Sequence, residues 1–256
     1  MIAVSLQSGS NGNCIYVEAA GVKLLFDAGI SGRQAEQRLA DLGRDIREVD
    51  ALIISHEHAD HLRCAGIFQR KYGLPLFITR QTLEAGKAQN LGQLRDVRFF
   101  QAGATLPFGA TSVETVPTPH DGADGVAFVV EARRKRLGIL TDLGHLFAGL
   151  SETIASLDAV FLESNFDPEM LDRGPYPDFL KRRIRGRGGH ISNQEAAGLL
   201  NTAAPDRLQW ACLAHLSEQN NDPELARETH RRVLADRFPL HIAGRYRAST
   251  VLVIEE

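Results

Sequence analysis

The chain alternates short apolar runs with polar segments of helical period along most of its length. The first predicted elements are three strands and a helix, near residues 2–6, 13–18, 22–27 and 31–42. Strands and helices then alternate to about residue 90, a strand-rich stretch covers 97–141, and alternation resumes to a final strand at 250–254. Two such halves predict an α/β fold in which two packed sheets carry helices on their outer faces.

Composition supports one domain. No repeat, low-complexity tract or Pro/Ser-rich linker divides residues 1–256, and a 43% hydrophobic content can fill a substantial core. The net charge is −3, so any contact with nucleic acid must be local.

Three scattered cysteines (Cys14, Cys64 and Cys212) indicate a reducing compartment. No apolar run approaches the ~20 residues that span a bilayer, and the first residues lack a basic leader. We therefore expect a cytoplasmic protein with no membrane contact and no obligate protein partner.

An apolar run at 51–54 breaks abruptly into side chains of the metal-binding type. Within Ser-His-Glu-His-Ala-Asp-His, the candidate ligands are His56, His58, Asp60 and His61. The two histidines that are two positions apart point the same way in an extended loop, and the other two ligands follow as the chain turns into a helix predicted at 62–72. A polar loop with incidental histidines is the alternative, but four such groups within six residues favour two adjacent ions.

Three further candidates follow strand-like stretches, namely His120, Asp142 and His215. Each alone is typical of a structural residue, but together they repeat one pattern, a ligand at the end of a strand. A pair of ions needs about six or seven protein ligands, which this set supplies. Asp27, in Leu-Leu-Phe-Asp-Ala-Gly, is predicted to orient a ligand or the strand ends, because metal-binding histidines usually need such a partner.

The ordered set of these residues resembles the metallo-β-lactamase superfamily of hydrolases. The resemblance implies an αββα sandwich of two mixed sheets with outer helices and a dinuclear site at one edge. It further implies that one ion is held by His56, His58 and His120. The other ion would be held by Asp60, His61 and His215, with Asp142 bridging the two.

A finer resemblance rests on the segments 8–14, 163–167, 189–193 and 215–221. These are similar to the YycJ/WalJ-type branch, single-domain relatives of nucleic-acid-processing phosphodiesterases, which implies nuclease-like activity on DNA ends. The interval between Asp142 and His215 is too short for the large insert of β-CASP-type nucleases. Residues 165–191 are therefore the predicted active-site cover.

The cover contains five cations in the seven residues 181–187, a density that suits a phosphate polyanion. Its predicted substrate contacts are Arg182, Arg183 and Arg185, although a solvated helix face is the alternative. Ser192 and Glu195 form a capping-box pattern that opens a helix at 193–203, and such a helix start beside glycines is suited to phosphate. A second basic run, 133–136, is predicted as a hairpin turn that serves solubility.

The predicted catalytic residues are Asp60 and His190. A hydroxide shared by two cations would attack phosphorus in line with the leaving oxygen, and His190 would donate the proton or contact phosphate. A helix-capping or packing role is the alternative for His190. Asn13, Asn165 and Asn193 are candidate hydrogen-bond donors in the pocket, or turn residues.

These features predict a metal-dependent phosphodiesterase, an exonuclease on DNA, with a small-molecule phosphodiesterase as the nearer alternative. A thioester hydrolase resembling glyoxalase II would use the same ligands but normally carries an appended helical domain. A non-catalytic scaffold would have little reason to keep the full ligand set. A diiron flavoprotein partner would need a fused flavin domain. Two divalent ions are the predicted cofactors, zinc first, with manganese or iron as alternatives.

Overall fold

The computed structural model describes residues 1–256 and contains two seven-stranded sheets packed face to face. The first sheet has the order β14-β1-β2-β3-β4-β5-β6, with strands Leu252–Val253, Ile2–Gln7, Cys14–Ala19, Val22–Phe26, Ala51–Ile53, Leu76–Thr79 and Val97–Phe100. The second has the order β13-β12-β11-β10-β9-β8-β7, with strands Leu240–Ile242, Trp210–Ala214, Ala159–Glu163, Lys135–Leu140, Val126–Ala132, Thr111–Pro117 and Thr105–Phe108.

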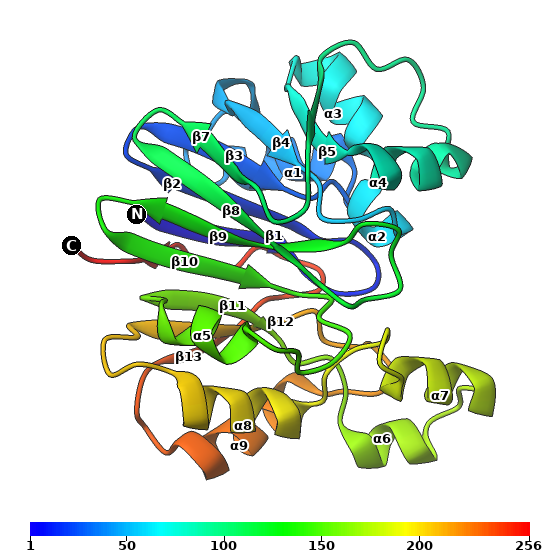
Figure 1. Cartoon of the computed structure of the whole chain (residues 1–256), viewed down its shortest axis with the longest axis vertical. Helices are drawn as coiled ribbons and strands as arrows, with labels where there is room; N and C mark the ends of the chain where they lie inside the picture. Colours follow the sequence, from blue (N-terminus) through cyan, green and yellow to red (C-terminus); the bar gives the residue numbers. More distant parts are fainter.

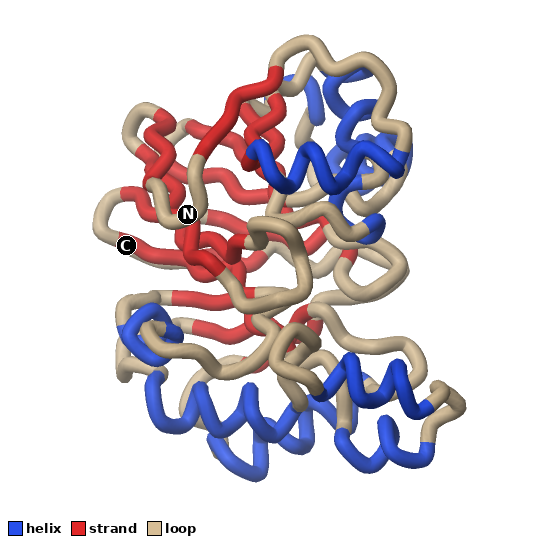
Figure 2. Tube along the Cα trace, turned by 45° about the vertical axis from the view of Figure 1, so that its right-hand side comes forward, coloured by secondary structure: helices blue, strands red, loops and turns tan.

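Both sheets are mixed. In the first, β3 to β6 run parallel while β14, β1, β2 and β3 pair antiparallel. In the second, β10 to β13 run parallel while β7, β8, β9 and β10 pair antiparallel. Helices lie on the two outer sides (Figures 1 and 2). The predicted αββα sandwich is therefore confirmed.

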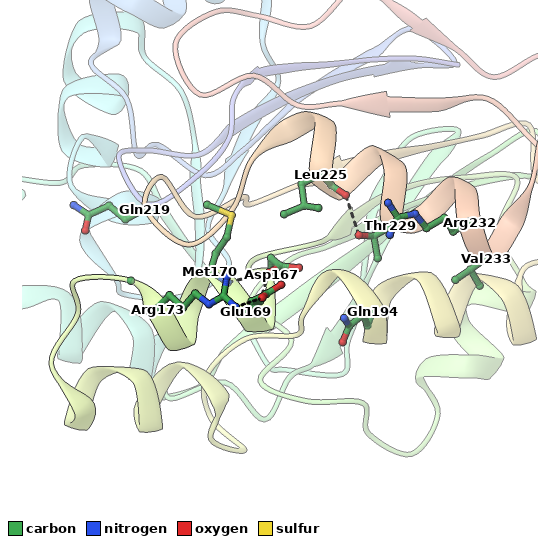
Figure 3. A pocket seen from close by; sticks show the side chains of 11 residues that line it. Asp167, Glu169, Met170, Arg173, Gln194, Gln219, Leu225, Thr229, Arg232 and Val233 are labelled. Atoms are coloured by element: carbon green, nitrogen blue, oxygen red, sulfur yellow. Dashed lines mark hydrogen bonds and ion pairs between the residues drawn. The ribbon is translucent and has the colours of Figure 1, made fainter.

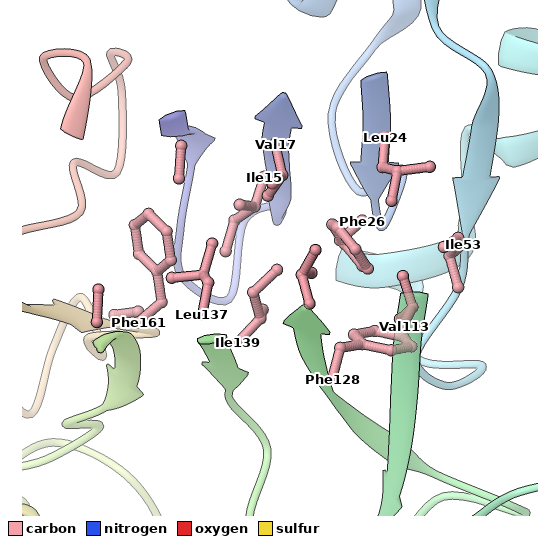
Figure 4. Packing of buried hydrophobic residues seen from close by; sticks show 14 of the residues in the cluster. Ile15, Val17, Leu24, Phe26, Ile53, Val113, Phe128, Leu137, Ile139 and Phe161 are labelled. Carbon is pink, nitrogen blue, oxygen red and sulfur yellow. The ribbon is translucent and has the colours of Figure 1, made fainter. Parts of the chain in front are cut away.

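The main core lies between the sheets and contains 23 buried residues. Alternate side chains of each strand point inward, as expected for strands that have one face on the core. Figure 4 shows Phe26 of β3 facing Phe128 of β9, and their ring centroids are 4.9 Å apart. Burial of these apolar side chains fixes how the two sheets face each other, and so fixes the relative positions of their strand ends.

Helices cover the outer faces. Those of the first half are α1 Gly32–Ala40, α2 Ala59–Leu62, α3 Ala65–Tyr72 and α4 Arg80–Ala85, with 3₁₀ turns at Ile46–Glu48 and Gly86–Gln89. Those of the second half are α5 Leu150–Ala155, α6 Pro168–Arg173, α7 Asp178–Arg185, α8 Asn193–Ala203 and α9 Pro223–Leu234. Two further apolar clusters join α1 and α3 to the first sheet, and α5 and α8 to the second. No helix is both long and apolar enough to cross a bilayer.

Two local expectations differ from the structure. The helix predicted at 62–72 begins later, as α3 at Ala65, because the chain turns at Arg63 and Cys64 after the short helix α2. Only the first two residues of the basic run 133–136 form the hairpin turn. Arg133 and Arg134 have positive φ values there, whereas β10 begins at Lys135. Arg136 pairs with two glutamates across the sheet, so its charge is used within the fold.

One edge of the sandwich gathers the carboxyl ends of strands from both sheets. β1, β3 and β4 of the first sheet and β8, β10, β11 and β12 of the second all run toward this edge. Loops from both halves meet there, which is where mixed α/β folds usually bind ligands. All candidate ligands of the sequence follow these strands.

Candidate metal centre

The structure brings the seven predicted ligands together at this edge. Within each of three groups, the candidate ligand atoms all lie within 4.8 Å of one another: His56, His58 and His120; Asp60, His61 and His215; and His56, His61 and Asp142. In the first group, Nδ1 of His58 and Nε2 of His120 are 3.2 Å apart. In the second, Oδ2 of Asp60 is 3.3 Å from Nε2 of His215.

Asp142 lies between the first two groups. Its Oδ2 is 3.3 Å from Nε2 of His61, and its Oδ1 is 3.7 Å from Nε2 of His120. One carboxylate thus faces a histidine of each group, which is the position that a bridging ligand requires. His61 also belongs to a group with His56 and Asp142, so the division of the ligands between two ions stays a prediction.

Strand-end backbone turns place three of these carboxylates and imidazoles. Asp27, Asp142 and His215 have φ values of +64°, +57° and +55°. Residues other than glycine adopt this left-handed conformation at a cost of about 1–2 kcal/mol, and Asp and His are among the side chains that tolerate it. Such strain is typical of functional sites, where the surrounding fold enforces it.

Asp27 orients two of the histidines. Its Oδ2 is 2.7 Å from Nδ1 of His61, so an Nδ1–H there donates to the carboxylate and leaves Nε2 facing the cluster. The backbone N–H and hydroxyl of Ser55 also donate to Asp27, and the same hydroxyl is 2.9 Å from Nδ1 of His56. A carboxylate that fixes ring orientation in this way is typical of metal-binding histidines.

Unsatisfied atoms in the cluster indicate a cation. Nε2 of His56 and Oδ2 of Asp142 are buried and make no hydrogen bond. A buried polar atom without a partner is costly, yet here a lone pair of each faces other ligand atoms. Imidazole and carboxylate together are the donors that divalent first-row metals prefer. These residues therefore fit a pair of divalent ions.

The charges of the cluster are strongly coupled. Burial would raise the pKa of Asp142, but the neighbouring His215 and His61 hold it well below its usual range. Burial would lower the pKa of His215, but Asp142 and Asp60 raise it to about 10. The pKa of His56 falls well below its usual range, because burial and the nearby His61 both oppose its protonation.

A cleft of about 360 Å³ opens over the ligands. His58 and Asp60 are the most accessible of them, with side chains 29% and 19% exposed. The cleft is lined by Ser10, His58, Ala59, Asp60, Asp142, Asn165, Tyr176, Leu180, Arg183, Ile184, His190, His215 and Ser217. A larger hollow of about 660 Å³ lies between α6, α8 and α9. Figure 3 shows side chains that line it, such as Met170 and Leu225. That hollow contains none of the ligand groups, so the chemistry belongs to the smaller cleft.

Glu163 is a site residue that sequence reasoning missed. It is fully buried at the end of β11, and its Oε1 is 2.7 Å from Nδ1 of His190. The backbone N–H groups of Leu143 and Ile191 donate to its other oxygen. Burial would raise the pKa of Glu163, but His190 lowers it to about 2. Its place at a strand end was the available signal, the same one that pointed to Asp142.

Asp121 was missed as well. Its Oδ1 is 3.5 Å from Nε2 of both His58 and His120, and its Oδ2 accepts a hydrogen bond from Nε of Arg183 at 2.7 Å. Burial would raise the pKa of Asp121, but the bond from Arg183 keeps it below its usual value. Asp121 thus joins the tri-histidine group to α7.

The three predicted asparagines have different surroundings. Nδ2 of Asn13 is 3.3 Å from Oδ2 of Asp60 and 3.0 Å from Nε2 of His61, so it touches the ligands themselves. Asn165 lines the cleft and donates to the backbone oxygen of His215 at 2.7 Å. Asn193 is fully buried, bonded to Ser164 and Asn221, and does not line the cleft. The geometry of Asn193 indicates a structural role.

The basic run on α7 also divides. Arg183 lines the cleft, and Arg182 is exposed. Arg185 turns back to α6, where it pairs with Asp172 at 2.7 Å and donates to the backbone oxygen of Pro168. The start of α8 is closed by its own capping box, in which Ser192 and Glu195 bond each other's backbone N–H groups. An anion at that helix start would meet the Glu195 carboxylate.

Comparison with known proteins agrees with this geometry. A family model described as the metallo-beta-lactamase superfamily matches residues 8–148. The chain is 36% identical to exodeoxyribonuclease YycJ of Bacillus anthracis, over 91% of this chain and 88% of that protein. It is 34% identical to exodeoxyribonuclease WalJ of Streptococcus pneumoniae serotype 2 (strain D39), over 88% of this chain and 84% of that protein.

A solved structure, the metallo-beta-lactamase fold protein YhfI from Bacillus subtilis, superposes with a TM-score of 0.73 over 97% of this chain and 98% of that one. Its sequence is only 16% identical, so it shows the fold alone. The family model and the two relatives together show that the chain belongs to the metallo-beta-lactamase superfamily, within its YycJ/WalJ-like group.

Proposed function

We propose that the protein is a dinuclear metal-dependent phosphodiesterase that acts as an exonuclease on DNA ends. The observation that carries this proposal is the ligand cluster: two groups of three side chains that face one shared carboxylate, Asp142, under a narrow open cleft. The YycJ and WalJ relatives, which are similar over most of their length, are exodeoxyribonucleases, and this supports DNA as the substrate.

The proposed cofactors are two divalent ions, zinc first, with manganese or iron as alternatives. His56, His58 and His120 would hold one, and Asp60, His61 and His215 the other, with Asp142 between them. When bound, such a pair supplies a nucleophilic hydroxide near neutral pH and neutralises charge on the phosphate. Asp60 reaches the cleft while it contacts His215, so we assign it both a ligand role and the positioning of the attacking water.

His190 is the proposed proton donor to the leaving oxygen. It lines the cleft, and its Nδ1 is held by the buried Glu163 carboxylate. An Nδ1–H bound in this way leaves Nε2 free to exchange a proton with a substrate atom in the cleft. Glu163 would act through His190, by fixing the orientation of its imidazole.

DNA contacts must be local, because the protein has a net charge of −3. We assign them to Arg183, which lines the cleft, and to the exposed Arg182 beside it. Arg185 is a weaker candidate because it does not line the cleft and its guanidinium faces α6. We also propose a cytoplasmic protein, a location supported by its three free cysteines.

The test compares substrates with one metal-loaded preparation. We expect turnover of bis(p-nitrophenyl) phosphate and shortening of end-labelled DNA, with single- and double-stranded DNA and RNA assayed in parallel and zinc, manganese and iron titrated in turn. S-lactoylglutathione is included as the thioester substrate. Clear thioester cleavage without diester cleavage would overturn the proposal in favour of the glyoxalase II type.

A further inference from the structure

One wall of the metal cleft is apolar, although its floor is charged. Tyr176, Leu180 and Ile184 form this wall, whereas the ligands and His190 lie on the floor. We infer that this wall is a subsite for the nucleobase of the terminal nucleotide, with Tyr176 as its stacking platform. The inference rests on the proposed exonuclease function, because it assumes that a phosphodiester occupies the metal centre.

The wall is built as a fixed surface. Ile184 packs with Phe166 and Leu171 in a small cluster of its own, and Tyr176 and Leu180 pack against that cluster. Polar contacts close the α6–α7 pair around it. Nζ of Lys181 donates to the backbone oxygen of Asp172 at 2.7 Å, and Arg185 pairs with the carboxylate of the same residue. Figure 1 shows α6 and α7 side by side at one end of the second sheet.

The chemistry of the wall suits a base rather than a phosphate. Tyr176 and Leu180 are each half-buried and contribute exposed surface to the cleft. An aromatic ring stacks on any base and contributes roughly 1–3 kcal/mol per base in single-strand binding proteins. Arg183 comes from the same helix and lines the same cleft, so a guanidinium stands beside the apolar surface. A nucleotide has this combination of a flat apolar base and an anionic phosphate.

The size of the cleft suits a single nucleotide. About 360 Å³ is near the lower end of small-molecule sites, which run from roughly 300 to 1,000 Å³. A terminal base that stacks on Tyr176 has left its pairing partner, so single-stranded or frayed ends should be the preferred substrates.

The experiment uses metal-loaded full-length protein and single-stranded oligonucleotides whose terminal nucleotide is either normal or abasic (a tetrahydrofuran sugar), at each end in turn. At the end that the enzyme cleaves, the wild-type KM for the abasic oligonucleotide should exceed the KM for the normal one on the order of tenfold. This is the loss of affinity expected for one stacked base. Tyr176→Ala should cleave both ends with similar KM values, and Tyr176→Phe should restore the discrimination because it keeps the ring.

Phe179→Ala is the matched control. Phe179 is an aromatic residue of the same helix, 68% exposed, that does not line the cleft, so its loss should leave the discrimination unchanged. A binding measurement independent of turnover uses 2-aminopurine as the terminal base. Its fluorescence should be quenched on binding to wild type and Tyr176→Phe, and less quenched on Tyr176→Ala at equal saturation by anisotropy.

The outcomes separate the subsite from the proposed function. If wild type degrades DNA but treats normal and abasic ends alike, or if Tyr176→Ala keeps the discrimination, the subsite is wrong and the exonuclease stands. If no oligonucleotide is shortened under any metal, the proposed function fails and the subsite fails with it.

Discussion

Nδ1 of His190 lies 2.7 Å from Oε1 of Glu163, and that carboxylate is fully buried at the end of β11. Two backbone N–H groups, of Leu143 and Ile191, hold its second oxygen. The carboxylate therefore has a fixed position, and it accepts the hydrogen bond from His190 through Oε1. The imidazole is oriented by this contact, and its other nitrogen remains for the cleft.

Glu163→Gln should lower kcat on DNA on the order of 10²-fold, the scale of a lost general acid. The amide keeps the shape of the side chain but removes the negative charge that accepts the Nδ1–H of His190. The alkoxide that leaves DNA needs a proton far more than p-nitrophenolate does, so the loss should be much smaller on bis(p-nitrophenyl) phosphate. Steady-state kinetics on both substrates measures this difference.

The exposed Glu169→Gln on α6 is the matched control for Glu163→Gln and should behave as wild type. Elemental analysis should find the same metal content in both variants. An equal loss on DNA and on the aryl diester would contradict the proton-donor role of His190 and indicate that Glu163 acts on the metal ligands instead.

His58→Ala should abolish hydrolysis and reduce bound metal while the fold survives. Its side chain is 29% exposed, the most of the seven ligands, so its loss should disturb packing less than the loss of any other ligand. The loss should be several orders of magnitude, since one ion would lose one of its three histidines. Circular dichroism, metal content and turnover are the measurements, with His241→Ala on β13 as a control outside the cluster. Turnover at the wild-type level would rule out the assigned centre.

The sequence predicted that these side chains gather at one edge, because each follows an apolar strand, and strands that run the same way end at the same edge. That logic needs only local pattern and direction, and it placed Asp142 and His215 beside residues far earlier in the chain. Strand bounds were close for the same reason: the strands expected near 2–6, 13–18 and 22–27 lie at Ile2–Gln7, Cys14–Ala19 and Val22–Phe26.

Interactions that depend on tertiary packing could not be predicted in this way. Glu163 meets His190 only because β11 ends beside the loop that precedes α8. Basic residues of α7 look alike in sequence, but one face of the helix meets the cleft and another meets α6, so Arg183 and Arg185 have different partners. Asn193 shows the same limit, because a buried bond to Ser164 is invisible to local pattern.

The division of the α7 arginines gives a direct prediction. Replacing Arg182 and Arg183 together by Ala should weaken the binding of single-stranded DNA and reduce the salt dependence of log K by about 0.7 for each phosphate that is no longer neutralised. Cleavage of a small diester should fall less, since it has fewer phosphates for these arginines to bind. Binding isotherms at several salt concentrations measure the slope.

Arg185→Ala is the comparison within the same helix. Its guanidinium binds Asp172 and the backbone oxygen of Pro168 on α6. Loss of this side chain should therefore lower the melting temperature of the protein, while the affinity for DNA changes little. If Arg185→Ala weakens DNA binding as much as the double variant does, the run acts as an undivided basic patch, and the assignment of Arg183 to the cleft has no special meaning.

Metal binding should release protons. In metal-stripped protein, Asp142 and Asp60 raise the pKa of His215 to about 10 against burial, and carboxylates likewise raise the pKa of His61 above its usual value. A charged imidazole must lose a proton to bind an ion. We expect at least one proton released per protein at pH 7, from His215, with His61 adding to it, measured by calorimetry in buffers of different ionisation enthalpy.

The raised pKa of His215 sets opposite pH trends for the stability of the metal-stripped protein and for its affinity for metal. Because the folded pKa of His215 lies above its ordinary value of 6.5, its proton stabilises the metal-stripped fold fully below pH 6.5, and this contribution is lost as the pH rises through about 10. The melting temperature of the stripped protein should thus fall across that range, whereas metal affinity should rise with pH because fewer protons are displaced. Two results together would contradict this prediction: a melting temperature of the stripped protein that rises from pH 6.5 to 10, and metal binding that releases no proton. They would show that the carboxylates do not keep these histidines protonated.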